Sequence, residues 1–287
     1  MQVKKLGVLG AGAMGAGIAH LAAQRGIEVV LGDIDMKFVD GGVARMEKLM
    51  AGSVKKGKMT EDEAKAVLGR IKKTVAVEDY SDFSDCDYVI EAIIENLKIK
   101  QNAFAKLDSV TKPETILASN TSSMSLTEIA AATKRPEKVV GMHFFNPPQV
   151  MKLVEIIRGY YTSDETVKAT QEFTEQLNKI SVDIKKDAPG FVVNRIMMAS
   201  AMEAMKLYEE GVASMEDIDK AVKLGLNYPM GPFELMDFTG VDINKAILDY
   251  LSGESMDVRW NPPLSIKLLM KSGRLGRKTG AGWYKYE

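Results

Sequence analysis

One short motif, GAGAMG at residues 10–15, restricts the possible folds more than any other feature of the sequence. It has the spacing G-x-G-x-x-G, follows the apolar run KLGVLG and opens a segment expected to be helical to about residue 25. In such a loop the first glycine permits a tight turn, the second lets a pyrophosphate approach the backbone, and the third allows close helix packing. The helix N-terminus adds N–H donors and a favourable dipole. The residues expected to bind a dinucleotide are Gly10, Gly12, Ala13, Met14 and Gly15.

Asp33 ends the second expected strand, VVLGD at residues 29–33. A carboxylate at this position can accept hydrogen bonds from the ribose hydroxyls of adenosine. It would repel a 2′-phosphate, and no arginine stands beside it in the sequence, so NAD(H) is favoured over NADP(H) as the cofactor. The alternative is a glycine-rich turn followed by an ordinary strand-end acid. Loop, helix, strand and acid nevertheless occur in the order that a dinucleotide site requires.

Short apolar runs alternate with helical segments through the first part of the chain. Val, Ile and Leu predominate in these runs, as in strands buried within a parallel sheet. The runs lie at 5–10, 29–33, 87–92, 115–119 and 138–144. Residues 36–57 are expected to be helical although they contain glycines, each of which costs a helix about 1 kcal/mol relative to alanine. The alternation predicts an α/β fold with an N-terminal Rossmann-type doubly wound sheet over residues 1–186.

The character of the sequence changes after about residue 186. Strand-like runs almost vanish, and a long helical pattern follows the segment DAPG and closes at Gly211. Ser214 and Asp242 are expected to cap two further helices. Residues 187–287 are therefore expected to form an all-α C-terminal domain. Its first helix is apolar on more than one face, which is typical of a central core helix and also of a surface buried against a second subunit.

Composition excludes several classes of protein. The 287 residues carry a formal net charge of −1, so bulk charge would attract neither nucleic acid nor an anionic membrane. The single cysteine, Cys86, excludes an internal disulfide and a cysteine-based metal site. No stretch approaches the ~20 apolar residues of a membrane helix, and the N-terminal residues lack a secretory apolar region. We therefore expect a cytoplasmic protein that acts on a small molecule, with no nucleic acid, membrane or metal as partner.

Two ionisable residues, His143 and Glu155, lie in the apolar stretch GMHFFNPPQVMKLVEII at 141–157. A nicotinamide-dependent oxidation needs a proton acceptor, and histidine is the usual choice near neutral pH. His143 ends an expected parallel strand, at the sheet edge where ligands bind, whereas His20 is most simply a packed helix residue. A buried carboxylate is costly unless it is paired. We therefore expect the strand after the Pro-Pro turn to bring Glu155 beside His143 and orient its ring; a purely structural ion pair is the alternative.

Seven segments in one order resemble the short-chain 3-hydroxyacyl-CoA dehydrogenases, and most closely the bacterial 3-hydroxybutyryl-CoA dehydrogenases. The resemblance extends over essentially the whole chain. The segments are GAGAMG, DYVIEAIIENLKIKQ, ASNTSSMSLTEIA, GMHFFNPPQVMKLVEII, DAPGFVVNR, YPMGPFELMDFTGVD and GRKTGAGWYKYE.

This resemblance implies the interconversion of (S)-3-hydroxybutyryl-CoA and acetoacetyl-CoA with NAD(H), in a cleft between the domains of a homodimer formed through the helical domain. His143 is then the general acid or base and Glu155 its partner, while Ser122 and Asn194 hold the substrate oxygen. The resemblance also implies Glu95, Lys100, Asn146 and Lys267 near the cofactor and Lys56 near the CoA phosphates. Taken alone, these residues fit simpler descriptions, such as a turn serine, a helix-start asparagine and a solvated lysine.

Two alternatives stay open. Another NAD-dependent hydroxyacid dehydrogenase would share the glycine loop and a helical domain, but such enzymes typically use a catalytic lysine. A non-catalytic NAD-binding protein, such as the lens crystallin built on this fold, belongs to a different class.

Overall fold

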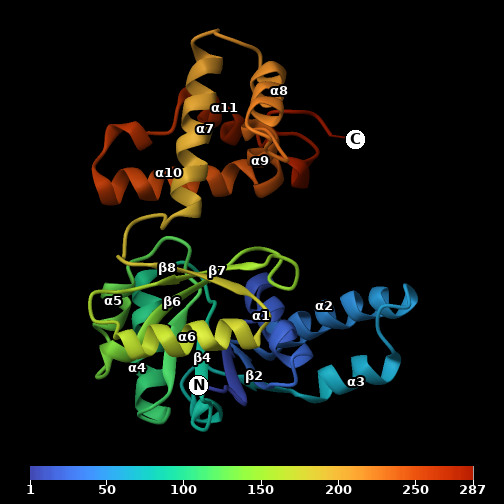
Figure 1. Cartoon of the computed structure of the whole chain (residues 1–287), viewed down its shortest axis with the longest axis vertical. Coiled ribbons are helices and arrows are strands. Elements are labelled where there is room, and N and C mark those ends of the chain that lie inside the picture. The colour runs from blue at the N-terminus through green and yellow to red at the C-terminus, as the bar shows by residue number, and fades with distance from the viewer. Residues whose placement is uncertain (287) are drawn as a thin grey trace. The chain divides into compact units, whose positions relative to one another are not determined.

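An eight-stranded sheet organises the first of the two units into which the chain divides, Met1–Asp187 and Ala188–Glu287 (Figure 1). The structure is a computed structural model, and it describes residues 1–286. Helices cover the sheet in the first unit, and helices build the second. The expected fold class is confirmed: a Rossmann-type doubly wound sheet precedes an all-α part.

The strands of the first unit follow the order β3-β2-β1-β4-β5-β6-β7-β8. Every neighbouring pair is parallel except β6 with β7, which is antiparallel. Because β2 and β4 flank β1 on opposite sides, the strand order reverses between β1 and β4, and ligands bind outside the carboxyl ends of strands at such a point. The strand bounds are β1 Lys5–Leu9, β2 Glu28–Asp33, β3 Ile71–Val75, β4 Tyr88–Glu91, β5 Ile116–Ser119, β6 Val139–Phe144, β7 Leu153–Ile157 and β8 Ile180–Ile184.

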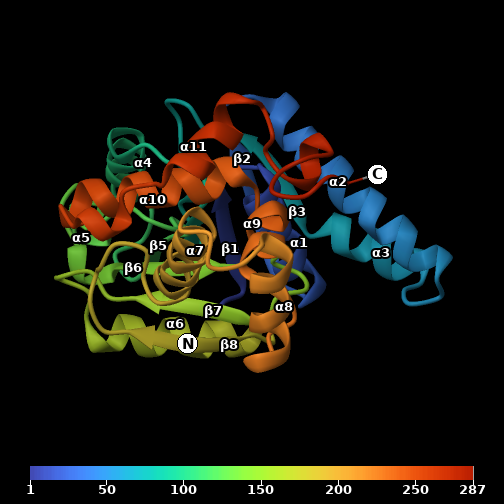
Figure 2. The ribbon, with the colours of Figure 1, turned by 90° about the horizontal axis from the view of Figure 1, so that it is seen from above.

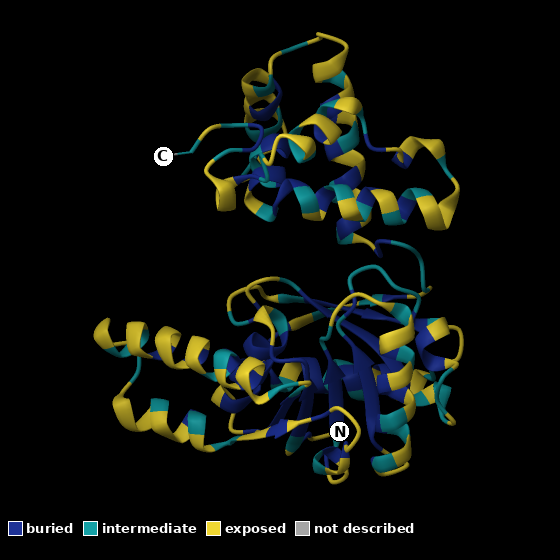
Figure 3. Ribbon diagram, turned by 180° about the vertical axis from the view of Figure 1, so that it is seen from behind, coloured by how far each residue is buried: buried dark blue, intermediate teal, exposed yellow. Residues whose placement is uncertain are grey.

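The two outermost strands, β3 and β8, are not among the strands expected from apolar runs. In β3, IKKTV, three polar residues separate two apolar ones, and in β8, ISVDI, apolar and polar residues alternate, so neither strand contains a continuous apolar run and much of each is exposed. The central strands are instead buried along their length (Figure 3). These edge strands need less apolar sequence because fewer of their side chains are buried than in the central strands.

Helices lie on both faces of the sheet, with α4 and α5 on one side and α6 on the other (Figure 2). The side chain of Asp35 caps α2, which spans Met36–Lys55, within the segment 36–57 that the sequence predicts to be helical. At Gly42 a Cβ would lie 2.9 Å from the carbonyl oxygen of Ala11, so this glycine lets α2 lie close to the glycine loop. The helix bounds are α1 Ala13–Gln24, α2 Met36–Lys55, α3 Glu61–Gly69, α4 Leu97–Val110, α5 Leu126–Ala130 and α6 Asp164–Gln176.

The second unit contains α7 Val193–Glu209, α8 Met215–Gly225, α9 Pro232–Thr239, α10 Val241–Ser255 and α11 Leu264–Lys271. Ser214 caps α8, as expected. The expected cap at Asp242 is wrong, because α9 and α10 share Gly240 as C-cap and N-cap, which places Asp242 in the first turn of α10. There its carboxylate forms an ion pair with Lys278 at 2.6 Å.

Two buried aspartates of the second unit hold its C-terminal segment. Asp237 accepts hydrogen bonds from the backbone N–H groups of Trp283 (2.8 Å) and Tyr284 (2.9 Å) and from the hydroxyl of Tyr286 (2.9 Å). Asp219 accepts from the hydroxyl of Tyr284 at 2.8 Å and from two backbone N–H groups at the start of α9. These bonds join the last part of the chain to α8 and α9.

Candidate active site

The glycine loop forms part of a pocket of about 860 Å³ in the first unit. Gly10 has a φ of +106°, and a Cβ there would collide with the backbone carbonyl of Ala92. Nothing lies within 4 Å of the position that a Cβ would take at Gly12. This glycine is the N-cap of α1, so no side chain caps the first N–H groups of the helix. The helix N-terminus therefore presents backbone N–H groups to the pocket, as a pyrophosphate requires.

Asp33 lines the same pocket at the end of β2. Its Oδ2 accepts a hydrogen bond from the backbone N–H of Ala11 at 2.6 Å, and its Oδ1 accepts from that of Ile34 at 2.7 Å. These bonds fix the carboxylate, and a carboxylate has further lone pairs that can accept from ribose hydroxyls. The loop, the helix start and Asp33 thus fit the dinucleotide that the sequence predicts.

Arg45 also lines this pocket, although no arginine stands beside Asp33 in the sequence. Its Nη2 donates to the carbonyl oxygen of Ala11 at 2.5 Å. Its Nη1 lies 3.8 Å from the position that a Cβ would take at Gly41, so the arginine side chain passes over a residue without a side chain. Because α2 folds back onto the glycine loop, an arginine remote in sequence adds a positive charge to the cofactor pocket.

His143 and Glu155 face each other across β6 and β7. The antiparallel ladder pairs these two residues directly, and the imidazole Nδ1 lies 2.8 Å from the carboxylate Oε2. His143 is 6% exposed and Glu155 1%. The structure therefore brings together the two side chains that the sequence pairs. Since β6 is parallel to the strands between it and β1, His143 lies near the same edge of the sheet as the glycine loop.

A second ionisable cluster lies at this edge, where β4 and β5 end. The Nζ of Lys100 lies 2.6 Å from Glu91 Oε1 and 3.2 Å from Glu95 Oε2. Lys100 is 1% exposed and Glu91 0%. Glu95 in turn accepts a hydrogen bond from the backbone N–H of Ser122 at 3.0 Å, with the Ser122 hydroxyl 3.4 Å away. Three residues that the resemblance implies are thus joined in one network.

Glu91 is the member of this network that the sequence analysis missed. Its signal resembles that of Asp33: an acidic residue closes a strand buried along its length. The strand end alone does not identify its partners, because Lys100 comes from the first turn of α4 and contacts it only after the helix has folded back.

The other predicted site residues are separate from these clusters. Asn146 is exposed in the turn that follows β6, and Lys56 is the exposed C-cap of α2. Asn194 and Lys267 belong to the second unit, where Asn194 is buried on α7 and Lys267 is exposed on α11.

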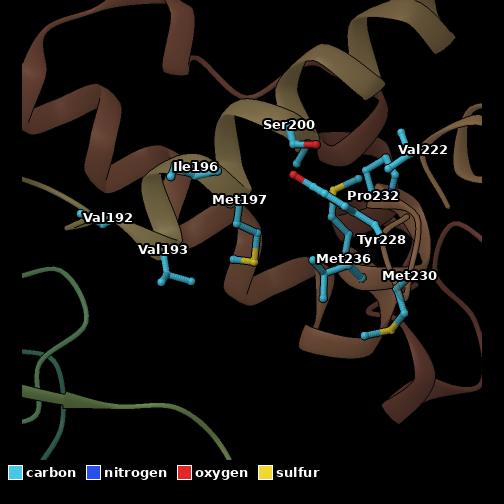
Figure 4. A pocket seen from close by; sticks show the side chains of 12 residues that line it. Val192, Val193, Ile196, Met197, Ser200, Val222, Tyr228, Met230, Pro232 and Met236 are labelled. Carbon is cyan, nitrogen blue, oxygen red and sulfur yellow. The ribbon is translucent and has the colours of Figure 1, made fainter. Parts of the chain in front are cut away.

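The second unit contains a pocket of about 280 Å³ between α7, α8 and α9 (Figure 4). Side chains of α7 such as Val193, Ile196 and Met197 line one wall, and Tyr228, Met230 and Met236 lie opposite. Most of the lining is apolar. One face of α7 therefore packs into the core of the unit, while another borders this pocket.

His20 has different surroundings from His143. It is buried on α1, and burial lowers its pKa below the usual value. Its Nδ1 lies 3.5 Å from the amide nitrogen of Gln149, and its Nε2 has no hydrogen-bond partner within residues 1–286. No carboxylate among the described residues pairs with it, so it fits a packed core residue.

Over residues 1–286, no helix is long and apolar enough to cross a membrane. The described part of the chain also contains no group of three or more His, Cys, Asp or Glu residues that could hold a metal ion.

Comparisons with known proteins agree with these features. Residues 5–188 match the model of the 3-hydroxyacyl-CoA dehydrogenase NAD binding domain, and residues 190–286 match that of the 3-hydroxyacyl-CoA dehydrogenase C-terminal domain. A probable 3-hydroxybutyryl-CoA dehydrogenase of Deinococcus radiodurans is 48% identical over 98% of this chain and 100% of its own. The mitochondrial hydroxyacyl-coenzyme A dehydrogenase of Homo sapiens is 43% identical over 99% of this chain and 92% of its own.

Solved structures are similar over the full chain. The (S)-3-hydroxybutyryl-CoA dehydrogenase of Ralstonia eutropha has a TM-score of 0.93 at 42% identity, with 100% of both chains covered. A diketoreductase, described as acting on dicarbonyl compounds, has a TM-score of 0.86 at 28% identity, also with 100% of both chains covered.

Proposed function

The chain belongs to the 3-hydroxyacyl-CoA dehydrogenase family, an NAD-dependent oxidoreductase family, and from this premise we propose that it interconverts (S)-3-hydroxybutyryl-CoA and acetoacetyl-CoA. The observation that carries the proposal is the contact of 2.8 Å between His143 Nδ1 and Glu155 Oε2, buried at the sheet edge that also carries the glycine loop. A structural ion pair would not need that location, whereas a proton-transfer group beside a dinucleotide does.

The cofactor residues of the proposal are those of the pocket in the first unit. Backbone N–H groups of the glycine loop and of the start of α1 would hold the pyrophosphate, and Asp33 would hold the ribose. Bound NAD(H) supplies the hydride chemistry at C3 of the substrate.

His143 performs the proton transfer in this mechanism. Its Nδ1 donates to Glu155, so Nε2 is the nitrogen that exchanges a proton with the substrate. In the oxidative direction Nε2 takes the proton of the 3-hydroxyl group as the C3–H bond breaks. In the reductive direction the doubly protonated ring returns that proton to the oxygen of acetoacetyl-CoA. Glu155 keeps the ring in one tautomer and stabilises its positive charge.

Ser122 and Asn194 hold the substrate oxygen in the proposal, as the family resemblance implies. Ser122 is positioned by Glu95, which accepts its backbone N–H. A hydrogen bond to an oxygen that gains negative charge in the transition state stabilises that state more than the ground state.

Cofactor preference is the finer part of the proposal. Asp33 favours NAD(H), while Arg45 in the same pocket opposes part of that preference. We expect kcat/KM to be higher with NADH than with NADPH, and the ratio to fall in Asp33→Asn. An unchanged ratio in that variant would assign the preference to another residue.

The experiment that tests the function is a turnover assay with acetoacetyl-CoA, free acetoacetate and a simple dicarbonyl compound, each with NADH. The proposal expects acetoacetyl-CoA to be reduced with the highest kcat/KM. The similarity to a diketoreductase favours one specific competitor, a reductase of dicarbonyl compounds without CoA. Activity confined to the substrates without CoA would establish that competitor instead.

A homodimer through the second unit is a further proposal. The apolar pocket beside α7 supports it, because a monomer gains nothing from an apolar hollow between surface side chains. Light scattering of the purified protein should give twice the chain mass of 31.5 kDa. The Ile196→Asp variant should give the mass of a single chain. A monomeric wild-type protein at micromolar concentration would contradict this proposal. The cytoplasmic location stays a prediction.

A further inference from the structure

Glu91 makes more hydrogen bonds at the ligand edge of the sheet than a strand-end residue needs. Its Oε1 accepts from Lys100 at 2.6 Å and from the backbone N–H of Ile93 at 2.7 Å, and its Oε2 accepts from the hydroxyl of Ser119 at 2.6 Å. It is 0% exposed, so every one of these bonds is made away from water. A carboxylate held this way has a single position.

Two routes lead from Glu91 to one loop, residues 120–122. The first passes through Lys100 to Glu95, which accepts the Thr121 hydroxyl at 3.0 Å and the Ser122 backbone N–H at 3.0 Å. The second passes through Ser119, whose hydroxyl oxygen accepts the backbone N–H of Thr121 at 3.2 Å. The loop therefore takes its position from one buried charge.

The same loop is bonded to the strand that carries the proton-transfer histidine. The Asn120 side-chain oxygen accepts the backbone N–H of Phe144 at 2.9 Å, and Phe144 directly follows His143. The backbone N–H of Asn120 donates to the carbonyl oxygen of Glu91 at 2.8 Å. Glu91 is thus linked to Ser122 on one side and to the end of β6 on the other.

We propose that Glu91 is a positioning residue for the dehydrogenase reaction, which fixes the Ser122 loop relative to His143 through Lys100, Glu95 and Ser119. The inference rests on the proposed function, because that function places Ser122 and His143 on the same substrate oxygen. It assigns Lys100 a role through its two carboxylate contacts, since its ammonium is buried between them.

Removing the charge of Glu91 while keeping its shape changes which carboxylate the Lys100 ammonium contacts most closely. In Glu91→Gln, Lys100 retains Glu95 as its carboxylate partner and draws it from 3.2 Å into closer contact. Glu95 then moves away from the Ser122 N–H. A displacement of this kind near reacting atoms lowers kcat by about 10- to 100-fold even when the substrate still binds, so KM for acetoacetyl-CoA should change by less than about 3-fold.

The test compares wild type, Glu91→Gln, Ser119→Ala and a matched control, Asp108→Asn. Asp108 forms a largely buried ion pair with Arg135 at 3.2 Å on the other end of α4, and none of its hydrogen bonds or ion pairs among the described residues reaches the loop. The measurements are kcat and KM for acetoacetyl-CoA, the kinetic isotope effect with NADH deuterated at the transferred position, and amide hydrogen exchange of residues 119–124 without ligands.

The inference expects three results for Glu91→Gln: a lower kcat, a larger isotope effect because hydride transfer has become slower than the other steps, and amide exchange at 121–124 faster by about 10-fold, the size of one lost hydrogen bond. Ser119→Ala, which removes only the second route, should show the same changes at smaller size. Asp108→Asn should lose stability and show none of them, because a purely structural defect leaves the native molecules that remain with normal kinetics.

The inference would be overturned if Glu91→Gln and Ser119→Ala reduced acetoacetyl-CoA at the wild-type rate, with an unchanged isotope effect and unchanged amide exchange in the loop. The proposed function would then remain intact. If Glu91→Gln does not fold, Ser119→Ala decides the matter alone. A wild-type protein without any activity on acetoacetyl-CoA would overturn the proposed function and the inference with it.

Discussion

Both units bury carboxylates, but the partners of those carboxylates differ. In the first unit Glu155 contacts an imidazole and Glu91 an ammonium, both of which can carry charge. In the second unit Asp219 and Asp237 accept hydrogen bonds from backbone N–H groups and tyrosine hydroxyls. Neutral donors of this kind hold the chain without exchanging protons. The comparison teaches that the partner of a buried acid indicates chemistry better than its burial does.

Protonation in the second unit fits this contrast. Burial raises the pKa of Asp219, although hydrogen bonds from its neighbours oppose the shift. Burial, followed by the hydrogen bond to Asp237, raises the pKa of Tyr286 to about 12. The tyrosine therefore remains a donor throughout the physiological range, and its bond to Asp237 does not switch with pH.

The largest expected effect comes from replacing the proton-transfer group. His143→Gln should lower kcat for acetoacetyl-CoA reduction by about 10³-fold, equal to about 4 kcal/mol of transition-state stabilisation, because no other side chain then moves the proton. Steady-state kinetics measure the loss, and calorimetric titration with NADH should give an unchanged Kd. Turnover within tenfold of wild type would mean that the paired acid of the first unit, like those of the second, serves only structure. The main support for the mechanism would then be lost.

The next effect concerns the partner of that group. Glu155→Gln should lower kcat by about 100-fold, or about 2.7 kcal/mol, because the amide no longer selects one ring tautomer or stabilises its charge. Steady-state kinetics across the pH range measure it. Glu155→Asp is the matched variant and should retain more activity than the glutamine variant. An equal loss in both would indicate a packing role for Glu155.

The second unit should respond in stability instead of turnover. Asp237→Asn presents an NH₂ group to donors and should lower the free energy of unfolding by about 2 kcal/mol, with kcat per folded molecule within twofold of wild type. Urea unfolding and active-site titration measure the two quantities. A drop in kcat at full folding would mean that the aspartates of this unit also serve the reaction.

The smallest effect separates the two histidines. The folded-state pKa of His20 is lowered by burial, so as the pH falls below about 6.5 the unfolded chain binds the proton first and stability declines. The decline is at most about 1.4 kcal/mol per pH unit for one proton. Urea unfolding at about pH 7.5 and about pH 5.5 should show a smaller decline in stability in His20→Gln than in the wild type. Equal declines would contradict the assignment.

The sequence predicts the features that depend on neighbouring residues. The glycine loop, the strand-end Asp33, the central strands and the cap at Ser214 depend on local patterns, and the structure contains each of them. The pairing of His143 with Glu155 could be predicted because a single turn joins β6 to β7.

Other features depend on contacts between distant segments, and local patterns do not indicate them. Arg45 meets the glycine loop because α2 packs on Ala11 through Gly42, and Glu91 meets Lys100 only when α4 has folded against the sheet. The strands β3 and β8 lack an apolar run because they lie at the edges. Asp242 fails as a cap because α9 and α10 share Gly240, a junction that a capping rule for single helices does not contain.

The bonds from Asp237 to residues 283, 284 and 286 also bear on how the protein is made. The first unit takes its core from residues 1–187 and can fold while the ribosome is still translating the second unit. The helical unit cannot satisfy its buried aspartates until synthesis has passed residue 286. Prematurely terminated chains would therefore contain a folded sheet unit and an incompletely folded helical unit. Cellular proteases would degrade the helical unit first.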